Sequence, residues 1–120
     1  MNMKRDMYTI MQDGHPITIS GNDKDDFLMS NLPEAKMSEA LDILRGWFEP
    51  SNKTSLRHTS YGMKHWLEDA VSCYISNNQF KDAMLILGFE PSDYSELNWC
   101  FKIKPTRVLK KYLEDSERWW

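Results

Sequence analysis

Residues 60–88 read SYGMKHWLEDAVSCYISNNQFKDAMLILG, and this stretch decides the fold class. In its first half, apolar residues recur three and four positions apart, which is the spacing of one face of a helix. The pattern predicts a helix over residues 61–73 with Thr59 or Ser60 as its N-cap. Its predicted buried face consists of Met63, Trp66, Leu67, Ala70 and Val71.

The second half of the stretch carries signals for both the start and the end of a helix. Ser76, followed three residues later by Gln79, matches a capping box, in which side chain and backbone bond to each other at a helix start. Gly88 suits the left-handed position that closes a helix. These signals predict a helix over residues 77–87, separated from the preceding helix by a short turn.

A strand and a last helix are expected on the C-terminal side of this pair. Apolar and polar residues alternate over residues 98–104, which predicts a half-buried strand. Pro105 and Thr106 then open a helix that carries Val108, Leu109, Tyr112 and Leu113. The order helix, turn, helix, loop and strand is that of a helix-turn-helix with one wing strand.

The N-terminal side is expected to add a helix and a hairpin. Apolar spacing predicts a helix over residues 33–48, with Pro33 at its first position and Pro50 after its end. Residues 7–19 predict a β-hairpin, because Asp13-Gly14 suits a tight type I′ turn between two β-prone segments.

Length and composition favour one small α+β domain over residues 1–120. Its acidic hairpin-plus-helix half, residues 1–50, holds five Lys and Arg against nine Asp and Glu. The winged-helix-like half, residues 51–120, holds ten against nine. No apolar run approaches the ~20 residues of a membrane span, and the start of the chain lacks the apolar core of a signal peptide. We therefore expect a cytoplasmic protein without a membrane partner.

The helix pair suggests a nucleic-acid interface. Asn and Gln at the start of the helix over 77–87 could bond adenine edges, and Lys could reach phosphate or guanine. Two basic stretches without acids flank the pair and would contact phosphates. The candidate residues are Arg57, Lys64, Asn77, Asn78, Gln79, Lys81, Lys102, Lys104, Arg107, Lys110 and Lys111. The simpler alternative is that the Asn and Gln residues only cap a helix and that the charges form solvated faces.

No pattern in the chain points to catalysis. His65, Glu68 and Asp69 would share a helix face and could hold a metal or exchange protons, but no second ligand pair has a recognisable spacing. We therefore expect a surface salt-bridge cluster there. The sequence has no Gly-rich phosphate loop and no nucleophile motif. We expect that the protein is not an enzyme and that it binds no cofactor and no metal. We also expect Cys73 and Cys100 to be buried free thiols.

Trp119 and Trp120 allow two interpretations. They could pack against a partner chain, because Trp is enriched at the energetic centres of interfaces. The favoured alternative is that they fold back onto their own domain.

Several segments between residues 58 and 103 resemble a group of short, uncharacterised proteins from phages and mobile elements of gut and Gram-positive bacteria. That group reads Ser-Tyr-Gly-Leu-Lys-His where this chain has Met63 in place of Leu. The resemblance rests on residues 59–65, 74–80, Ala83-Met84, Gly88-Phe89 and 98–101. The same stretch is similar to small winged-helix modules of phage replication proteins. The resemblance implies a bacterial or phage context.

These observations together lead to the expectation of a small bacterial, phage or mobile-element accessory protein that binds DNA through a winged-helix-like half. The alternative is a protein-binding module or an inhibitor of a host protein. In that case an acidic loop with Asp23, Asp25 and Asp26 would suit a basic partner.

Overall fold

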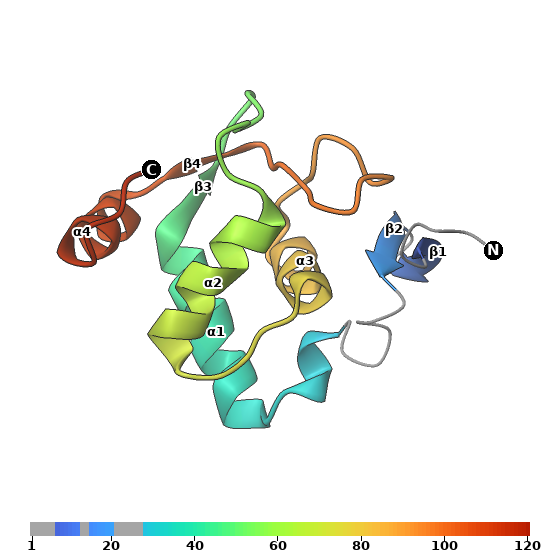
Figure 1. The fold of residues 1–120 in the computed structure, drawn as a ribbon, viewed down its shortest axis with the longest axis horizontal. Coiled ribbons are helices and arrows are strands. Elements are labelled where there is room, and N and C mark those ends of the chain that lie inside the picture. The colour runs from blue at the N-terminus through green and yellow to red at the C-terminus, as the bar shows by residue number, and fades with distance from the viewer. Residues whose placement is uncertain (1–6, 13–14, 21–27) are drawn as a thin grey trace.

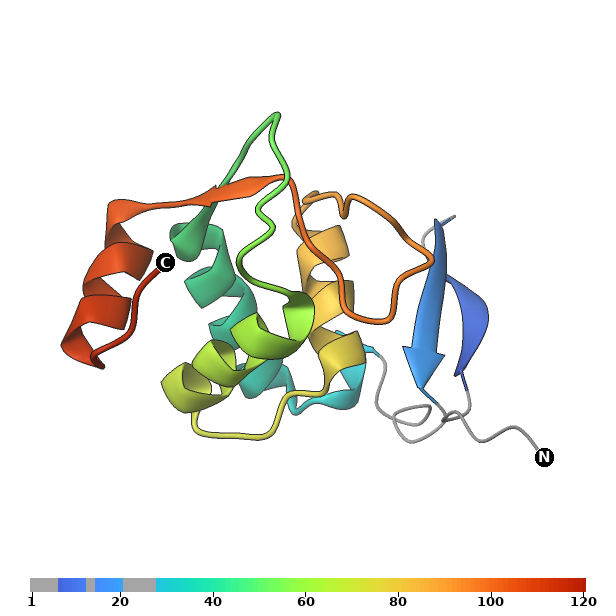
Figure 2. The same ribbon diagram turned by 45° about the horizontal axis from the view of Figure 1, so that its top comes forward.

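The structure, a computed structural model, describes residues 7–12, 15–20 and 28–120. Helices α1, α2 and α3 pack together, and a short ribbon of two strands, β3 and β4, leads to α4, as Figure 1 and Figure 2 show. The predicted α+β class is confirmed. The elements are β1 (Met7–Gln12), β2 (His15–Ser20), the 3₁₀ turn η2 (Met29–Asn31), α1 (Glu34–Trp47), β3 (Phe48–Pro50), α2 (Ser60–Val71), α3 (Asn77–Ile86), β4 (Ile103–Pro105) and α4 (Arg107–Asp115).

Helix α1 is one residue shorter at each end than the apolar spacing predicts. Pro33 is its N-cap rather than its first helical residue. Phe48 was expected in the helix, but its backbone is extended and begins β3. Pro50 follows within the same short strand, where it lacks the N–H that a further helical turn would need. The side chain of Phe48 is nevertheless buried, with its ring 6.2 Å from that of Phe89.

Helices α2 and α3 start where their predicted caps lie. The Thr59 hydroxyl accepts a hydrogen bond from the backbone of Gly62 at the start of α2. The Ser76 hydroxyl accepts from the Gln79 backbone N–H at 3.0 Å, and the Gln79 side-chain oxygen accepts from the Ser76 N–H at 2.9 Å. The capping box that opens α3 is therefore confirmed.

Gly88 ends α3 in the left-handed conformation that the sequence predicts, with φ of 86°. The Gly88 N–H donates to the Leu85 carbonyl at 3.0 Å, and the Phe89 N–H donates to the Met84 carbonyl at 2.9 Å. These two bonds define a Schellman motif, which a residue with a Cβ would strain at position 88. The motif turns the chain back toward the core, where Phe89 is buried.

The predicted strand over residues 98–104 is wrong in its length. Only β4 pairs with β3, in an antiparallel ribbon, and Phe101 makes an isolated bridge to Pro91. Trp99 does not join the ladder, because its backbone N–H and C=O bond to the Ser60 side chain and backbone. The predicted alternation is confirmed, since Trp99, Phe101 and Ile103 are buried while Lys102 and Lys104 are exposed.

Strands β1 and β2 pair antiparallel, from Met7 opposite Ser20 to Gln12 opposite His15. The predicted turn at Asp13-Gly14 lies outside the described residues, so the type I′ hairpin stays a prediction. The predicted acidic loop with Asp23, Asp25 and Asp26 also lies outside them.

The core joins the three packed helices to the ribbon and to α4. Trp99 and Phe101 meet edge to face at 5.9 Å in its centre. Leu109 and Leu113 of α4 are buried at helical spacing, and the Tyr112 hydroxyl donates to the Trp66 carbonyl at 3.3 Å. Helix α4 is thus fixed to the body through its apolar face.

Cys73 and Cys100 are free thiols, as expected, but both are half-buried rather than buried. Partial burial raises the pKa of the Cys100 thiol, and the nearby Glu96 charge raises it further. A raised pKa keeps this thiol protonated and unreactive near neutral pH.

Candidate functional site

The four polar residues predicted to read bases at the start of α3 are not exposed. The expectation is wrong for Asn77, Asn78, Gln79 and Lys81, because each side chain is at most 5% exposed. Gln79 is used in the capping box and also donates to the Leu28 carbonyl at 3.3 Å. Asn77 donates to the Leu97 carbonyl at 3.1 Å and to the Asn98 side chain at 3.0 Å.

Lys81 is the extreme case, since it is fully buried. Its ammonium lies 4.7 Å from the centre of the Trp99 ring and donates to the Glu96 carbonyl at 3.5 Å. A cation over an indole face is attracted by the negative charge density of the ring. The loop near residues 96–99 therefore contacts α3, and the polar side chains at the start of this helix are buried.

Lys64 was also predicted to contact phosphate, and this expectation is wrong in the same way. The Lys64 side chain is 6% exposed, and its ammonium lies 3.3 Å from a carboxylate oxygen of Glu68. It also lies 4.8 Å from the centre of the Tyr74 ring and 5.5 Å from that of Tyr61. Its charge is therefore neutralised inside the fold.

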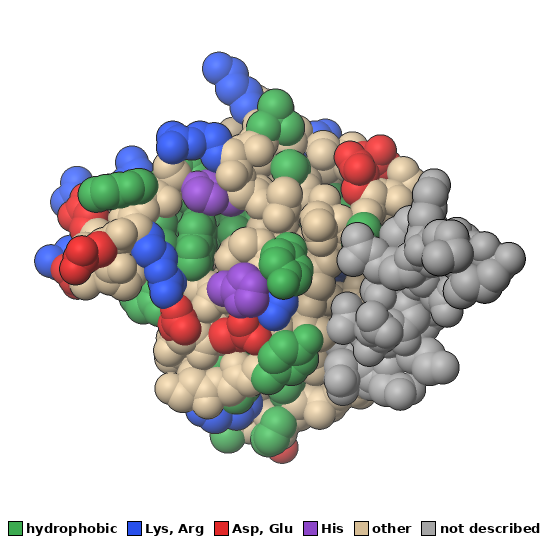
Figure 3. Space-filling view, viewed as in Figure 1, with side chains coloured by type: hydrophobic (Ala, Val, Ile, Leu, Met, Phe, Trp, Pro, Cys, Tyr) green, Lys and Arg blue, Asp and Glu red, His purple; other side chains and the backbone are tan. Residues whose placement is uncertain are grey.

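The remaining predicted basic residues are exposed and lie outside α3. Figure 3 shows Lys and Arg side chains gathered over the loop after β3 and over α4. Within the described part of the chain, six exposed Lys and Arg side chains have no carboxylate within ion-pair distance. We call these six the basic surface: Lys53, Arg57, Lys102, Lys104, Arg107 and Lys110.

The other exposed cations of the described residues are paired. Lys36 and Arg45 on α1 contact Glu39 and Asp42, and Lys111 contacts Asp115 at 3.1 Å. Ion pairing therefore distinguishes these cations, whose charges are compensated by carboxylates, from the cations of the basic surface. It also removes Lys111 from the group of predicted candidates whose charge is uncompensated.

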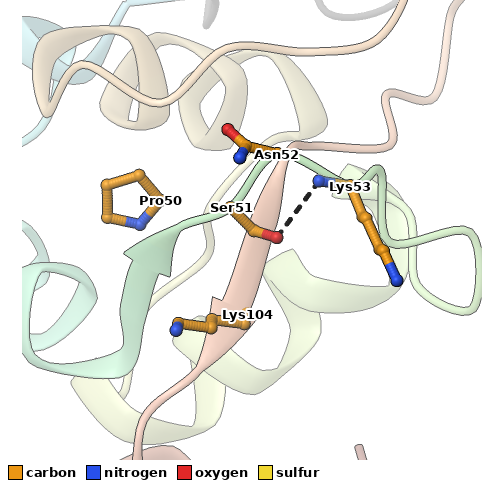
Figure 4. A pocket seen from close by; sticks show the side chains of 5 residues that line it. All are labelled: Pro50, Ser51, Asn52, Lys53 and Lys104. Carbon is orange, nitrogen blue, oxygen red and sulfur yellow. Dashed lines mark hydrogen bonds between the residues drawn. The ribbon is translucent and has the colours of Figure 1, made fainter.

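The basic surface has a hollow of about 420 Å³ at the ribbon, which Figure 4 shows at close range. Lys104 projects from β4, and Lys53 projects from the loop that follows β3. The Ser51 hydroxyl accepts from the Lys53 backbone N–H at 3.2 Å, which shapes the turn. The lining residues are Pro50, Ser51, Asn52, Lys53 and Lys104, so no acidic side chain lines this hollow.

A second hollow of about 300 Å³ shares Pro50, Ser51 and Asn52 with the first and brings in Lys102. Lys102 immediately precedes β4; both Lys102 and Lys104 are exposed, whereas Ile103 between them is buried. Two carboxylates flank the ribbon, at Glu90 in the second hollow and at Glu49 opposite Lys104.

The basic surface continues along the exposed side of α4. Arg107 and Lys110 are three residues apart and share a helix face, about 4.5 Å apart along the axis. Both lie in the N-terminal half of α4, next to β4. The basic surface therefore runs from the hollow at the ribbon onto this helix.

Comparison with known proteins gives no information about the function of the basic surface. No family model, no curated protein and no solved structure matches the chain. The resemblance to phage and mobile-element proteins therefore stays a prediction. Among the described residues, every helix is too short or too polar to span a lipid bilayer.

The predicted salt-bridge cluster on α2 is confirmed. His65 Nδ1 lies 2.8 Å from a Glu68 oxygen, and Asp69 pairs with Arg118. The second Glu68 oxygen accepts from the Ile75 backbone N–H at 3.1 Å. The carboxylates of Glu68 and Asp69 thus make contacts that stabilise the fold. In the described ranges, no three His, Cys, Asp or Glu side chains are grouped as a metal site would require.

Sequence reasoning missed part of the hollow. The candidates predicted from the sequence include Lys104 but not Ser51, Asn52 or Lys53. The signal that could have found them is Pro50, which prevents the helix from continuing and places the next residues in a surface loop.

Proposed function

We propose that this chain binds nucleic acid through the phosphate backbone, using the basic surface. The observation that carries the proposal is that six exposed cations of the described residues, on the loop after β3, at the ribbon and on α4, are unpaired, while most other described cations are paired. An unpaired exposed cation near phosphate releases condensed counterions on binding, which is the main source of sequence-independent affinity.

The proposed interface still lies in the winged-helix-like half, residues 51–120, but the residues that contact nucleic acid are no longer those of α3. The β3–β4 ribbon takes the role of the wing, and Arg107 and Lys110 of α4 extend it. Since these polar residues of α3 are buried, the proposal assigns them no contacts to base edges. Phosphate contacts position a protein on nucleic acid without reading its sequence, so we propose binding with little sequence preference. The predicted N-terminal hairpin has no part in this proposal.

The setting that we propose is the cytoplasm of a bacterium, with the protein acting as an accessory factor of a phage or mobile element. The net charge of −3 does not oppose this, because the acidic excess lies in residues 1–50. Local charge, rather than net charge, governs the approach of a polyanion to a surface on the scale of a Debye length, about 8–10 Å at physiological salt.

Replacing Lys53 and Lys104 by Ala tests the proposal. Both side chains line the larger hollow, so their removal should weaken binding to random-sequence DNA. Fluorescence anisotropy over a series of salt concentrations measures this. The slope of log affinity against log salt should become shallower by about 1 to 2, because each phosphate contact contributes nearly one unit.

The matched control replaces Lys36 and Arg45 by Ala. This variant loses the same two positive charges, but from residues already paired with Glu39 and Asp42 on α1. Its affinity and salt slope should stay close to those of the wild type. An equal loss in both variants would show a general charge effect and would contradict binding at the ribbon.

A further inference from the structure

Trp119 is more exposed than Trp120, the tryptophan beside it. Its side chain is 74% exposed. The ring of Trp120, by contrast, packs 6.2 Å from Phe48, 4.8 Å from His58 and 6.2 Å from Trp66. The interpretation that the two residues fold back is therefore right for Trp120 and wrong for Trp119.

The segment that carries Trp119 is held on both sides. Trp120 packs into an aromatic cluster after it, and Arg118 pairs with Asp69 of α2 before it. Fixing the residues on both sides of Trp119 lowers the backbone part of the conformational entropy that a ligand would otherwise have to remove. The indole is thus a flat apolar surface that is exposed on a segment held at both ends.

The surroundings of Trp119 connect it to the basic surface. A hollow of about 160 Å³ is lined by Lys110, Glu114, Arg118, Trp119 and Trp120. Lys110 belongs to the basic surface and follows Arg107 by one helical turn. The hollow therefore combines an exposed aromatic face with an unpaired cation.

We propose that Trp119 stacks an unpaired nucleobase and that the ligand of the basic surface is a single strand. Stacking on an aromatic ring needs a free base face, which a base inside a duplex does not offer. The strand backbone would follow Lys110, Arg107 and Lys104 toward the ribbon. Glu114 would lie on the base side, because a carboxylate repels phosphate and accepts hydrogen bonds from base amino groups. This inference rests on the proposed function and names its substrate class.

The test compares Trp119→Ala with Trp119→Phe on labelled single-stranded and duplex DNA of equal length. Trp119→Ala should weaken single-strand binding about 5- to 100-fold, the loss expected for one stacked base. It should leave duplex binding and both salt slopes unchanged, since no phosphate contact is removed. Trp119→Phe should retain most of the affinity, because it keeps an aromatic face.

The matched control is Leu56→Ala, which removes an exposed apolar side chain from the loop after β3. It should leave binding to both DNA forms unchanged. Thermal melts followed by circular dichroism would show that the variants keep the fold, as expected for side chains that lie at the surface.

The two proposals fail in different ways. Unchanged single-strand binding by Trp119→Ala, or an equal loss of single-strand and duplex binding, would overturn stacking on Trp119. The basic surface would still stand if the variant with both Lys53→Ala and Lys104→Ala bound DNA more weakly than the wild type. Unchanged binding in the two-lysine variant would overturn the basic surface itself. A wild-type protein that binds neither form at low salt would overturn both.

Discussion

The surroundings of His58 change the acid–base chemistry of its side chain. Its imidazole forms a three-ring cluster with two indoles, with its centroid 4.8 Å from those of Trp66 and Trp120. The Nε2 atom is buried and has no hydrogen-bond partner. Burial lowers the pKa of His58 below its ordinary value of 6.5, a backbone hydrogen bond with Trp120 raises it, and the Arg57 charge lowers it further. The neutral imidazole is therefore the form that the fold favours.

This arrangement predicts loss of stability in acid. The unfolded chain binds a proton at His58 at a higher pH than the folded chain does, so the stability due to neutral His58 is complete above about pH 6.5 and falls below it. The melting temperature should drop between about pH 7.5 and about pH 5.5 by more in the wild type than in His58→Phe. Phe retains an aromatic ring beside the two indoles and has no group that binds a proton.

The pH comparison has its own control in His65→Gln. His65 is exposed beside Glu68 and has no ring contact with Trp66 or Trp120, so this variant should keep the acid-dependent drop attributed to His58. Identical drops in the wild type and in His58→Phe would show that another group causes the acid sensitivity.

At the scale of the elements, α3 shows what local sequence can and cannot predict. The capping box and the left-handed Gly88 involve residues a few positions apart, and both are confirmed. The burial of Asn77 and Lys81 depends on a loop near residues 96–99 that is distant along the chain. Helical periodicity identifies an apolar face, but it does not tell which other segment covers the polar one.

The ribbon of β3 and β4 also shows what local sequence can and cannot predict. Alternation over residues 98–104 predicts which side chains are buried, because alternation follows from extended backbone alone. Strand length also depends on hydrogen-bond partners, and Trp99 bonds to Ser60 instead of a strand. The hollow beside Lys104 needs Ser51 to Lys53 next to β4, which only the pairing of β3 with β4 provides.

Ser76→Ala should destabilise the protein by about 1 kcal/mol, because it leaves the Gln79 backbone N–H without its cap inside a buried helix start. Chemical denaturation followed by circular dichroism measures this difference. Ser38→Ala, at an exposed position within α1, should change stability by no more than a few tenths of a kcal/mol. Equal stability of the two variants would contradict a stabilising role for the capping box.

At the scale of the whole molecule, the charge that the surface presents depends on ion pairing as well as on composition. The sequence predicts an acidic first half and basic stretches in the second, and the exposed, unpaired cations of those stretches form the basic surface. It does not predict which cations are neutralised, since Lys64 and Glu68 are four residues apart like many pairs that never meet. Pairing in three dimensions decides which charges remain available to a ligand.

The most direct test of the central claim is the binding of the wild-type chain to random single-stranded and duplex DNA at low and at physiological salt. Fluorescence anisotropy should detect binding at low salt that weakens steeply toward physiological ionic strength, to dissociation constants of about 10⁻⁴ to 10⁻⁶ M. Absence of binding to either form at low salt would contradict phosphate recognition by the basic surface. The alternative of a protein partner would then be the one to pursue.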